Sequence, residues 1–180
     1  MDKKELLKIL RSSIKEFYAR DFYLIDDMHK VHEQAIAHRI AHYFENIVAK
    51  NNPTFYEEYN FDVEYNKNFN DPKFIFLQCF QCPDKNCSCR NYIEPKTKSR
   101  PDFLIHKRGS NEQNCLVVEF KKWDSKPEDI QYDINKLKYF TCPKGEYKYL
   151  LGCLVLLKEN SYKIEIFETG KKFSSKTYEK

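Results

Sequence analysis

Hydrophobic residues near the N-terminus recur at the spacing of two amphipathic helices. Asp2 can cap the first, with Glu5 as its capping partner, and apolar residues follow at helical spacing: Leu7, Leu10, Ile14 and Phe17. Asp26 and Asp27 can cap the second, which we expect from about Met28 to Lys50. The apolar stripe of this second helix consists of Ile36, Ile40, Tyr43, Phe44 and Ile47.

Glu33 stands out on the second predicted helix. Steps of four, seven and eleven residues from Glu33 reach Ala37, Ile40 and Phe44, so a carboxylate lies at one end of an otherwise apolar face. A glutamate near a helix start is favoured by the helix dipole, which is one explanation. The other explanation is a carboxylate aimed at a site near the sheet.

Alternation and apolar runs predict strands after Pro53, which ends the second helix. Residues 59–65 alternate, and we expect Phe61, Val63 and Tyr65 to share one face. Residues 149–157 form a nearly continuous apolar run, which is typical of a central strand buried on both faces. Residues 162–166 alternate and suit an edge strand, and residues 170–180 are polar and are expected to form a loose tail.

Between these strands, two apolar runs predict a β-hairpin. Arg100–His106 and Cys115–Lys121 flank a polar stretch that contains Gly109. If the hairpin is symmetric, Asp102 and Glu119 are cross-strand neighbours, with Cβ atoms roughly 5 Å apart.

The hairpin also predicts a charged cluster. Successive strand residues point to opposite faces, so Glu119 and Lys121 share a face and Phe120 points to the other. Two neighbouring carboxylates repel each other, and a divalent cation is the usual way to relieve that repulsion. The alternative is a pattern of charges on a solvated face, but the apolar residues beside them make this strand look central.

A third helix is predicted after the hairpin. Ser125 is its expected N-cap, with Pro127 and Glu128 in the first turn, and the helix ends before Pro143. Its inward residues are Ile130, Ile134 and Leu137. The predicted order is helix, helix, three strands, helix and two strands. This order indicates an α/β domain with a mixed sheet flanked by helices.

Composition narrows the class of protein. A chain of 180 residues, 41% hydrophobic and 16% aromatic, can form one domain with a real core, residues 1–180. The net charge of +4 permits nucleic-acid binding but does not indicate it. No run of 18 apolar residues exists, and the charged N-terminus has no secretory apolar region, so we expect a cytoplasmic protein without a membrane partner.

Residues 66–99 read as a Cys-rich insertion before the hairpin. Four of the seven cysteines lie there: Cys79, Cys82, Cys87 and Cys89. Four thiols at this spacing could close a tetrahedral structural Zn²⁺ site, and free reduced cysteines are the alternative. Cys115 and Cys153 lie in apolar strand patterns and are expected in the core.

Other polar residues have weaker patterns. His38 and His42 are four residues apart on a helix but have no third ligand, so we expect a surface or packing role. His106 shares the face of Asp102 and could line a substrate groove, but we favour a structural role for it. Basic residues flank the hairpin motif, and they either form a phosphate-contacting rim or are simply solvated: Lys96, Lys98, Arg100, Lys121, Lys122 and Lys126.

Pro101-Asp102 followed by Glu119-Phe120-Lys121 resembles the signature of the PD-(D/E)xK, or restriction-endonuclease-like, nuclease superfamily. The resemblance covers most of the chain, because the predicted element order is that of the superfamily core. Glu33 matches a glutamate that many members carry on the first core helix. The run from Asp133 to Leu137 is similar to an Asp-x-x-Lys-Leu pattern in uncharacterised bacterial members.

The resemblance implies a Mg²⁺- or Mn²⁺-dependent nuclease that cuts DNA, with a homodimer as one expectation. It implies that Asp102, Glu119 and the Phe120 carbonyl bind the metal and that Lys121 acts on the water. Glu33 would hold a second metal or a water. Weaker substrate candidates are Lys136, Lys122 and Arg100, and the alternative for Lys136 is an exposed pair with Asp133. The alternative function is a catalytically silent nucleic-acid- or protein-binding module on the same fold.

Overall fold

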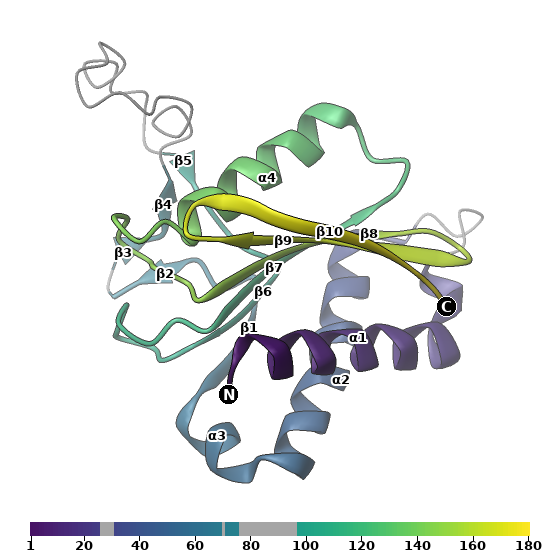
Figure 1. The fold of residues 1–180 in the computed structure, drawn as a ribbon, viewed down its shortest axis with the longest axis horizontal. Helices are drawn as coiled ribbons and strands as arrows, with labels where there is room; N and C mark the ends of the chain where they lie inside the picture. The colour runs from purple at the N-terminus through teal and green to yellow at the C-terminus, as the bar shows by residue number, and fades with distance from the viewer. Residues whose placement is uncertain (26–30, 70, 76–96) are drawn as a thin grey trace.

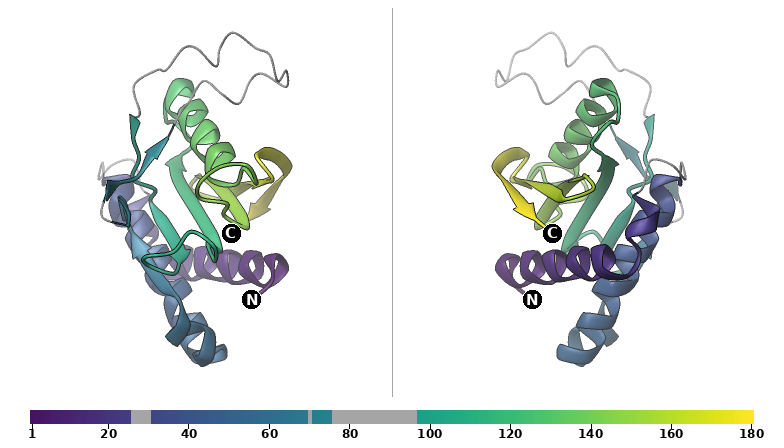
Figure 2. Two further views of the ribbon diagram at one scale, coloured as in Figure 1. Left: turned by 90° about the vertical axis from the view of Figure 1, so that its left-hand side faces the viewer. Right: turned by 90° about the vertical axis from the view of Figure 1, so that its right-hand side faces the viewer.

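The computed structural model describes residues 1–25, 31–69, 71–75 and 97–180. Within these residues the chain forms a six-stranded mixed sheet flanked by helices (Figure 1). Helices α1 (Lys3–Arg20) and α2 (Glu33–Asn51) cover one face, and α4 (Pro127–Phe140) covers the other. Figure 2 shows the same layers from the sides. The predicted α/β class with a mixed sheet between helices is therefore correct.

The strand order of the sheet is β1-β6-β7-β8-β9-β10, and only β7 and β8 run parallel. The strands are β1 (Asn60–Val63), β6 (Phe103–His106), β7 (Leu116–Lys122), β8 (Leu151–Leu157), β9 (Ser161–Glu168) and β10 (Lys171–Glu179). Short elements complete the described chain: η1 (Phe22–Leu24), α3 (Pro53–Glu58), β2 (Lys67–Asn68), β3 (Asp71–Pro72), β4 (Phe74–Ile75) and β5 (Thr97–Lys98).

Each face of the sheet buries its own hydrophobic core. The first core lies between the sheet and helices α1 and α2, and it includes Phe44, Phe103 and Phe120. The second core lies between the sheet and α4, and it includes Leu137 and Phe140. Every residue of β8 is buried, as predicted for a central strand. The site described below is therefore built on the inner strands of the sheet.

Helix α1 begins as predicted, because a carboxylate oxygen of Asp2 accepts a hydrogen bond from the N–H of Glu5 at 2.8 Å. The predicted start of the second helix near Met28 is wrong. Helix α2 starts at Glu33, after an extended His32 whose side chain makes no capping bond. Asp26, Asp27 and Met28 lie outside the described residues. The start at Glu33 has a tertiary cause, since β7 and the following turn hold the Glu33 carboxylate in place.

The region before the hairpin departs from simple alternation. Helix α2 does end before Pro53, but Pro53 then opens the unpredicted helix α3, capped by Asn52. The expected common face of residues 59–65 is also wrong. Phe61 and Val63 pack against the first core, whereas Tyr65 packs against the second. The positive φ of 53° at Glu64 breaks the alternation between them.

The C-terminal residues form a strand, so the predictions of a loose tail and of an edge position for residues 162–166 are both wrong. Strand β10 pairs along β9, which places β9 inside the sheet. Thr169 and Gly170 both have positive φ, as a type I′ hairpin turn requires. The polar composition of β10 concealed it. An exposed edge strand is stabilised by backbone hydrogen bonds to its neighbour and does not need alternate side chains to be buried, so its sequence need not alternate in hydrophobicity.

The start of α4 and the insertion also differ from expectation in part. The N-cap of α4 is Lys126 and not Ser125, whose hydroxyl donates to Glu33 instead, while the helix ends before Pro143 as predicted. Of the insertion, Ile75 is buried in the second core. Cys79, Cys82, Cys87, Cys89 and Lys96 lie outside the described residues, so the zinc site stays a prediction. Cys115 and Cys153 are free and buried, as expected for core residues.

None of the helices in the described part of the chain is long and apolar enough to cross a membrane.

The inner position of β9 can be tested with two phenylalanines. Phe167 on β9 is fully buried, and Phe173 on β10 is 71% exposed. We expect Phe167→Ala to lower the free energy of unfolding by about 3–5 kcal/mol, because it leaves a cavity in the second core. The matched control Phe173→Ala should change it by less than about 0.5 kcal/mol. Urea unfolding measures both, and equal losses would contradict the strand order.

Candidate active site

The β6–β7 hairpin brings the predicted motif residues together. Its pairs include Phe103 with Val118 and Leu104 with Val117, and continuing this register by one residue places Asp102 opposite Glu119. This is the register expected of a symmetric hairpin. A carboxylate oxygen of Asp102 also accepts a hydrogen bond from the backbone N–H of Phe120 at 2.8 Å. The Asp102 side chain is thereby held against β7 just beyond the end of β6.

Glu119 and Lys121 share the α4 face of β7, and Phe120 lies in the first core on the other face. Helix α4 supplies the partners. Lys136 Nζ lies 2.7 Å from Glu119 Oε1 and 3.1 Å from Asp133 Oδ1. All three of these side chains are buried. Lys136 therefore faces inward as the counter-ion of Glu119, and its pair with Asp133 is buried and not exposed as the alternative had it, while the phosphate contact stays a prediction.

Lys121 connects this cluster to helix α2. Its ammonium group donates a hydrogen bond to Glu33 Oε2 at 2.7 Å and lies 3.4 Å from Asp133 Oδ2. The other oxygen of Glu33 accepts hydrogen bonds from the Lys122 N–H at 3.1 Å and the Ser125 hydroxyl at 3.0 Å. The carboxylate at the start of α2 thus fixes both the end of β7 and the turn that follows it.

The predicted residues therefore form a chain of contacts and do not meet at a single point. Glu33 bonds to Lys121 and the turn, and it is joined to Glu119 through Asp133 and Lys136. Asp133 was not among the predicted site residues. A signal for it existed, because three- and four-residue steps from the inward Ile130 reach Asp133 and then Leu137.

Burial and like charges act on the two hairpin carboxyls. Burial raises the pKa of Glu119 well above its ordinary value of 4.5, and the carboxylates of Asp102 and Asp133 add to this while Lys136 opposes it. Burial also raises the pKa of Asp102 to about 6, against the hydrogen bond from the Phe120 N–H and the nearby lysines. Both groups hold protons more strongly than ordinary carboxyls.

The other members of the cluster are stabilised in their charged forms. Burial disfavours the charge on Lys121, but Asp133 and Glu33 outweigh it and raise the pKa of Lys121. In the same way, Glu119 and Asp133 outweigh burial and raise the pKa of Lys136. Burial also disfavours charge on Glu33, but the bonds from Lys121, Lys122 and Ser125 lower its pKa. Both lysines are therefore ammonium ions at neutral pH.

The buried cluster holds more carboxylates than ammonium groups. The cluster holds four carboxylates and two ammonium groups: Glu33, Asp102, Glu119 and Asp133 against Lys121 and Lys136. Fully ionised, it carries a formal surplus of two negative charges. Glu119 Oε1 and Asp133 Oδ2 are buried, and ion pairs with Lys136 and Lys121 compensate their charges.

Within the described residues, no group of three or more His, Cys, Asp and Glu side chains is arranged to hold a metal ion. Mg²⁺ commonly takes only one or two carboxylates and keeps its remaining waters. Asp102, Glu119 and the Phe120 carbonyl supply oxygen donors of the kind it uses. The N–H and C=O of one strand residue point to the same side, so the Phe120 carbonyl faces the side on which Asp102 lies.

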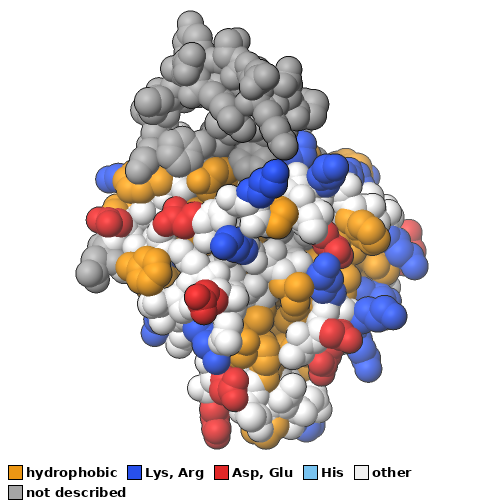
Figure 3. Space-filling model, turned by 60° about the vertical axis from the view of Figure 1, so that its left-hand side comes forward, with side chains coloured by type: hydrophobic (Ala, Val, Ile, Leu, Met, Phe, Trp, Pro, Cys, Tyr) orange, Lys and Arg blue, Asp and Glu red, His pale blue; other side chains and the backbone are white. Residues whose placement is uncertain are grey.

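The side chains of the remaining candidates form no ion pair with the cluster in the described part of the chain. Arg100 is exposed and lies 3.5 Å from Glu64, and Lys122 lines a pocket at the end of β7. His38 and His42 are exposed, as expected. His106 is buried 2.9 Å from Asp62. On the face in Figure 3, basic and acidic side chains are interspersed.

No family model matches the chain, and no curated protein or solved structure matches it either.

Lys136 should be the residue on which the folded cluster most depends. We expect Lys136→Met to lower the free energy of unfolding at neutral pH by about 3–5 kcal/mol, because Glu119 loses its counter-ion in a buried position. The exposed control Lys144→Met should stay within about 0.5 kcal/mol. In urea unfolding, the pair Glu119→Gln/Lys136→Met should recover part of the loss. A double variant as unstable as the sum of its parts would contradict the ion pair.

The raised pKa of Asp102 predicts a pH dependence of stability. The folded protein binds a proton there up to about pH 6, whereas the unfolded chain releases it near its ordinary value of 3.8. Stability from this group is therefore present below about pH 4 and lost as the pH rises to about 6. Comparison with Asp102→Asn by urea unfolding in EDTA isolates the effect. We expect the advantage of the wild type over Asp102→Asn to shrink across this window, and a constant difference would contradict it.

Proposed function

We propose that this protein is a cytoplasmic Mg²⁺-dependent nuclease of the PD-(D/E)xK type that hydrolyses DNA phosphodiester bonds. The observation that carries the proposal is the hairpin register, which sets Asp102 opposite Glu119 with Lys121 on the face of Glu119. Two carboxyl groups with raised pKa values and a protonated lysine thus lie together on the β6–β7 hairpin.

The order of elements supports a restriction-endonuclease-like fold. Helix α2 precedes strands β1, β6 and β7, which pair in sequence order as an antiparallel meander. Helix α4 then leads to β8, which pairs parallel to β7. This is the order that the sequence resemblance implies for the superfamily core. The additional strands β9 and β10 extend the sheet on the far side of β8.

The residues divide into metal-holding and charge-stabilising groups. Asp102, Glu119 and the Phe120 carbonyl would hold the Mg²⁺. When bound, Mg²⁺ supplies an activated water and neutralises charge on the phosphate in the transition state. Its two charges also match the surplus of two carboxylates in the cluster. Because their pKa values are raised, Asp102 and Glu119 hold protons that the cation must displace, so affinity should increase as the pH rises.

Lys121 acts as a cation in this proposal and not as a base, because its neighbours raise its pKa. Its ammonium group would stabilise negative charge that develops on the phosphate oxygens. Glu33 and Asp133 hold that ammonium group from two helices. Glu33 is thus a positioning residue for Lys121, which differs from the metal or water role that the resemblance implies.

One observation favours the alternative, a catalytically silent nucleic-acid- or protein-binding module. Lys136 Nζ lies 2.7 Å from Glu119 Oε1, so a lysine already neutralises the carboxylate that the metal would use. In a catalytic site, Lys136 would have to share the Glu119 carboxylate with the bound cation or move away from it. Cleavage and metal binding measured together distinguish the two functions.

Cleavage of plasmid and single-stranded DNA with Mg²⁺ or Mn²⁺ tests the proposal. We expect Glu119→Gln and Lys121→Ala each to reduce the rate about 100-fold or more, because each removes charge stabilisation from the transition state. Exposed control variants Glu128→Gln and Lys15→Ala should cleave at the wild-type rate.

The same metals should raise the unfolding temperature of the wild type but not that of Asp102→Asn. Equal cleavage by the wild type and both site variants would contradict the nuclease proposal. Metal-independent stability together with an absence of cleavage would favour the silent module.

A further inference from the structure

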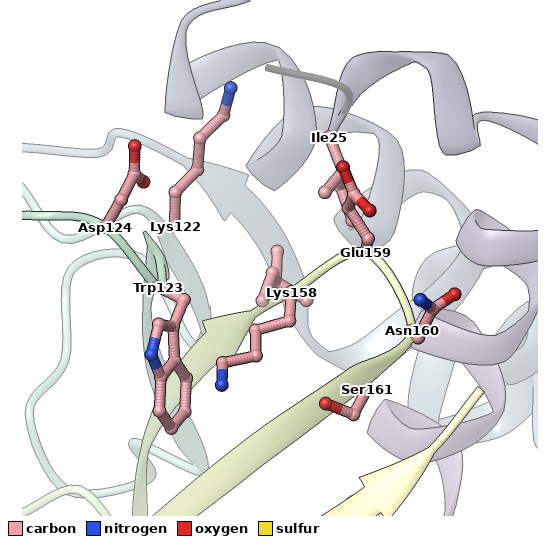
Figure 4. A pocket seen from close by; sticks show the side chains of 9 residues that line it. Ile25, Lys122, Trp123, Asp124, Lys158, Glu159, Asn160 and Ser161 are labelled. Carbon is pink, nitrogen blue, oxygen red and sulfur yellow. The ribbon is translucent and has the colours of Figure 1, made fainter.

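A second site lies directly beyond the cluster, in a pocket of about 360 Å³ between the end of β7 and the β8–β9 turn. This volume is within the range of small-molecule sites. Figure 4 shows Lys122, Trp123 and Asp124 on one side, and Ile25, Glu159 and Asn160 on the other. The proposed chemistry at Asp102 and Glu119 does not use these residues.

Trp123 is the principal apolar surface of this pocket. It is the only tryptophan of the chain and remains 46% exposed. The ammonium group of Lys158 lies 3.6 Å from the centre of its ring, in a cation–π contact that covers one ring face, so a base would stack on the other face. An exposed indole beside a cation is the combination that proteins use to stack an unpaired base and hold its phosphate.

The walls of the pocket are fixed by hydrogen bonds. The backbone N–H of Trp123 donates a hydrogen bond to the Leu157 carbonyl at 2.9 Å, which ties the two walls together. The Tyr18 hydroxyl lies 2.6 Å from the Lys158 carbonyl and 2.8 Å from that of Ser161, so α1 supports the turn. A preformed site loses less conformational entropy when a ligand binds.

The pocket is also linked to the proposed active site. Trp123 follows Lys121 by two residues and lies in the turn that ends β7. The Ser125 N–H donates to the Lys122 carbonyl at 3.1 Å, and the Ser125 hydroxyl donates to Glu33. A ligand on Trp123 would therefore lie beside the turn that the Glu33 carboxylate holds.

The polar lining suits a nucleotide. Neither Lys122 nor Lys158 forms an ion pair within the described part of the chain, so both ammonium groups can bind phosphate oxygens. Asp124, Glu159 and Asn160 carry acceptors for the N–H groups on base edges. Paired bases in a duplex expose neither a stacking face nor their pairing edge, whereas an unpaired base exposes both.

We infer that this pocket binds one unpaired base of the DNA strand being cut, with Trp123 as the stacking surface and Lys122 and Lys158 on the phosphates. The inference rests on the proposed nuclease function and specifies its substrate as single-stranded or locally unpaired DNA.

The single tryptophan reports on this pocket directly. Fluorescence is titrated with oligo(dT), with an abasic strand of the same length and charge, and with a duplex, all in EDTA so that no cleavage occurs. We expect oligo(dT) to quench Trp123 and to bind more tightly than the other two. Equal quenching by the abasic strand, tighter binding of the duplex, or an absence of quenching would overturn the inference.

Labelled oligo(dT) then measures the contribution of each residue by fluorescence anisotropy. Trp123→Ala should weaken binding about 5- to 150-fold, the range expected for loss of one stacked base, and should not weaken binding of the abasic strand. Lys158→Ala should weaken both strands. Phe173→Ala, which removes an exposed aromatic residue on β10, is the matched control. Circular dichroism confirms that each variant folds, and unchanged binding by folded Trp123→Ala would overturn the inference.

The two proposals fail separately. Cleavage with Mg²⁺ but no base-dependent quenching would support the nuclease proposal and contradict base binding in the pocket. Base-dependent quenching without cleavage in Mg²⁺ or Mn²⁺ would support base binding in the pocket and contradict the nuclease proposal.

Discussion

The structure around β7 depends on the neutralisation of buried carboxylates. Glu119 is 1% exposed in the interior of the sheet, where an unpaired charge would be very costly. Helix α4 meets this requirement with Lys136, and Asp133 on the same helix holds Lys136 and contacts Lys121. This network of ion pairs adds to the hydrophobic packing that places α4 over the sheet, and it holds the start of α2 at Glu33.

The network is not balanced, and the imbalance links stability to the proposed chemistry. The carboxylates exceed the ammonium groups, and the raised pKa values of Asp102 and Glu119 express that excess. A proton or a divalent cation can remove it. A cluster that was already neutral would gain little from binding a cation. An excess of buried negative charge is therefore expected at a site where the protein gives up stability for function.

Topology explains why the cluster and the Trp123 pocket are neighbours. Strands β7 and β8 are parallel, so Lys122 and Leu157 end them at the same edge of the sheet. In sheets with parallel strands, ligands commonly bind outside these carboxyl ends. The turn after β7 carries Trp123 and also Ser125, which binds Glu33. One short turn therefore belongs to both sites.

The sequence by itself determined the features that depend on local periodicity. Helix α1 and its Asp2 cap, the fully buried β8, and the hairpin register that sets Asp102 opposite Glu119 all follow from neighbouring residues. The pattern after Glu168 contained the Thr169-Gly170 turn, but β10 could not be recognised from side-chain burial, because its stability comes from backbone pairing with β9.

Only the tertiary structure decided which charges meet. It assigned Lys136 to Glu119 and the Ser125 hydroxyl to Glu33, where local patterns had indicated an exposed pair with Asp133 and a helix cap. It also brought Trp123 beside Lys158, which are 35 positions apart in the chain numbering. The physical reason is that a helical or strand period specifies the face on which a side chain lies, whereas its partner is set by how distant elements pack.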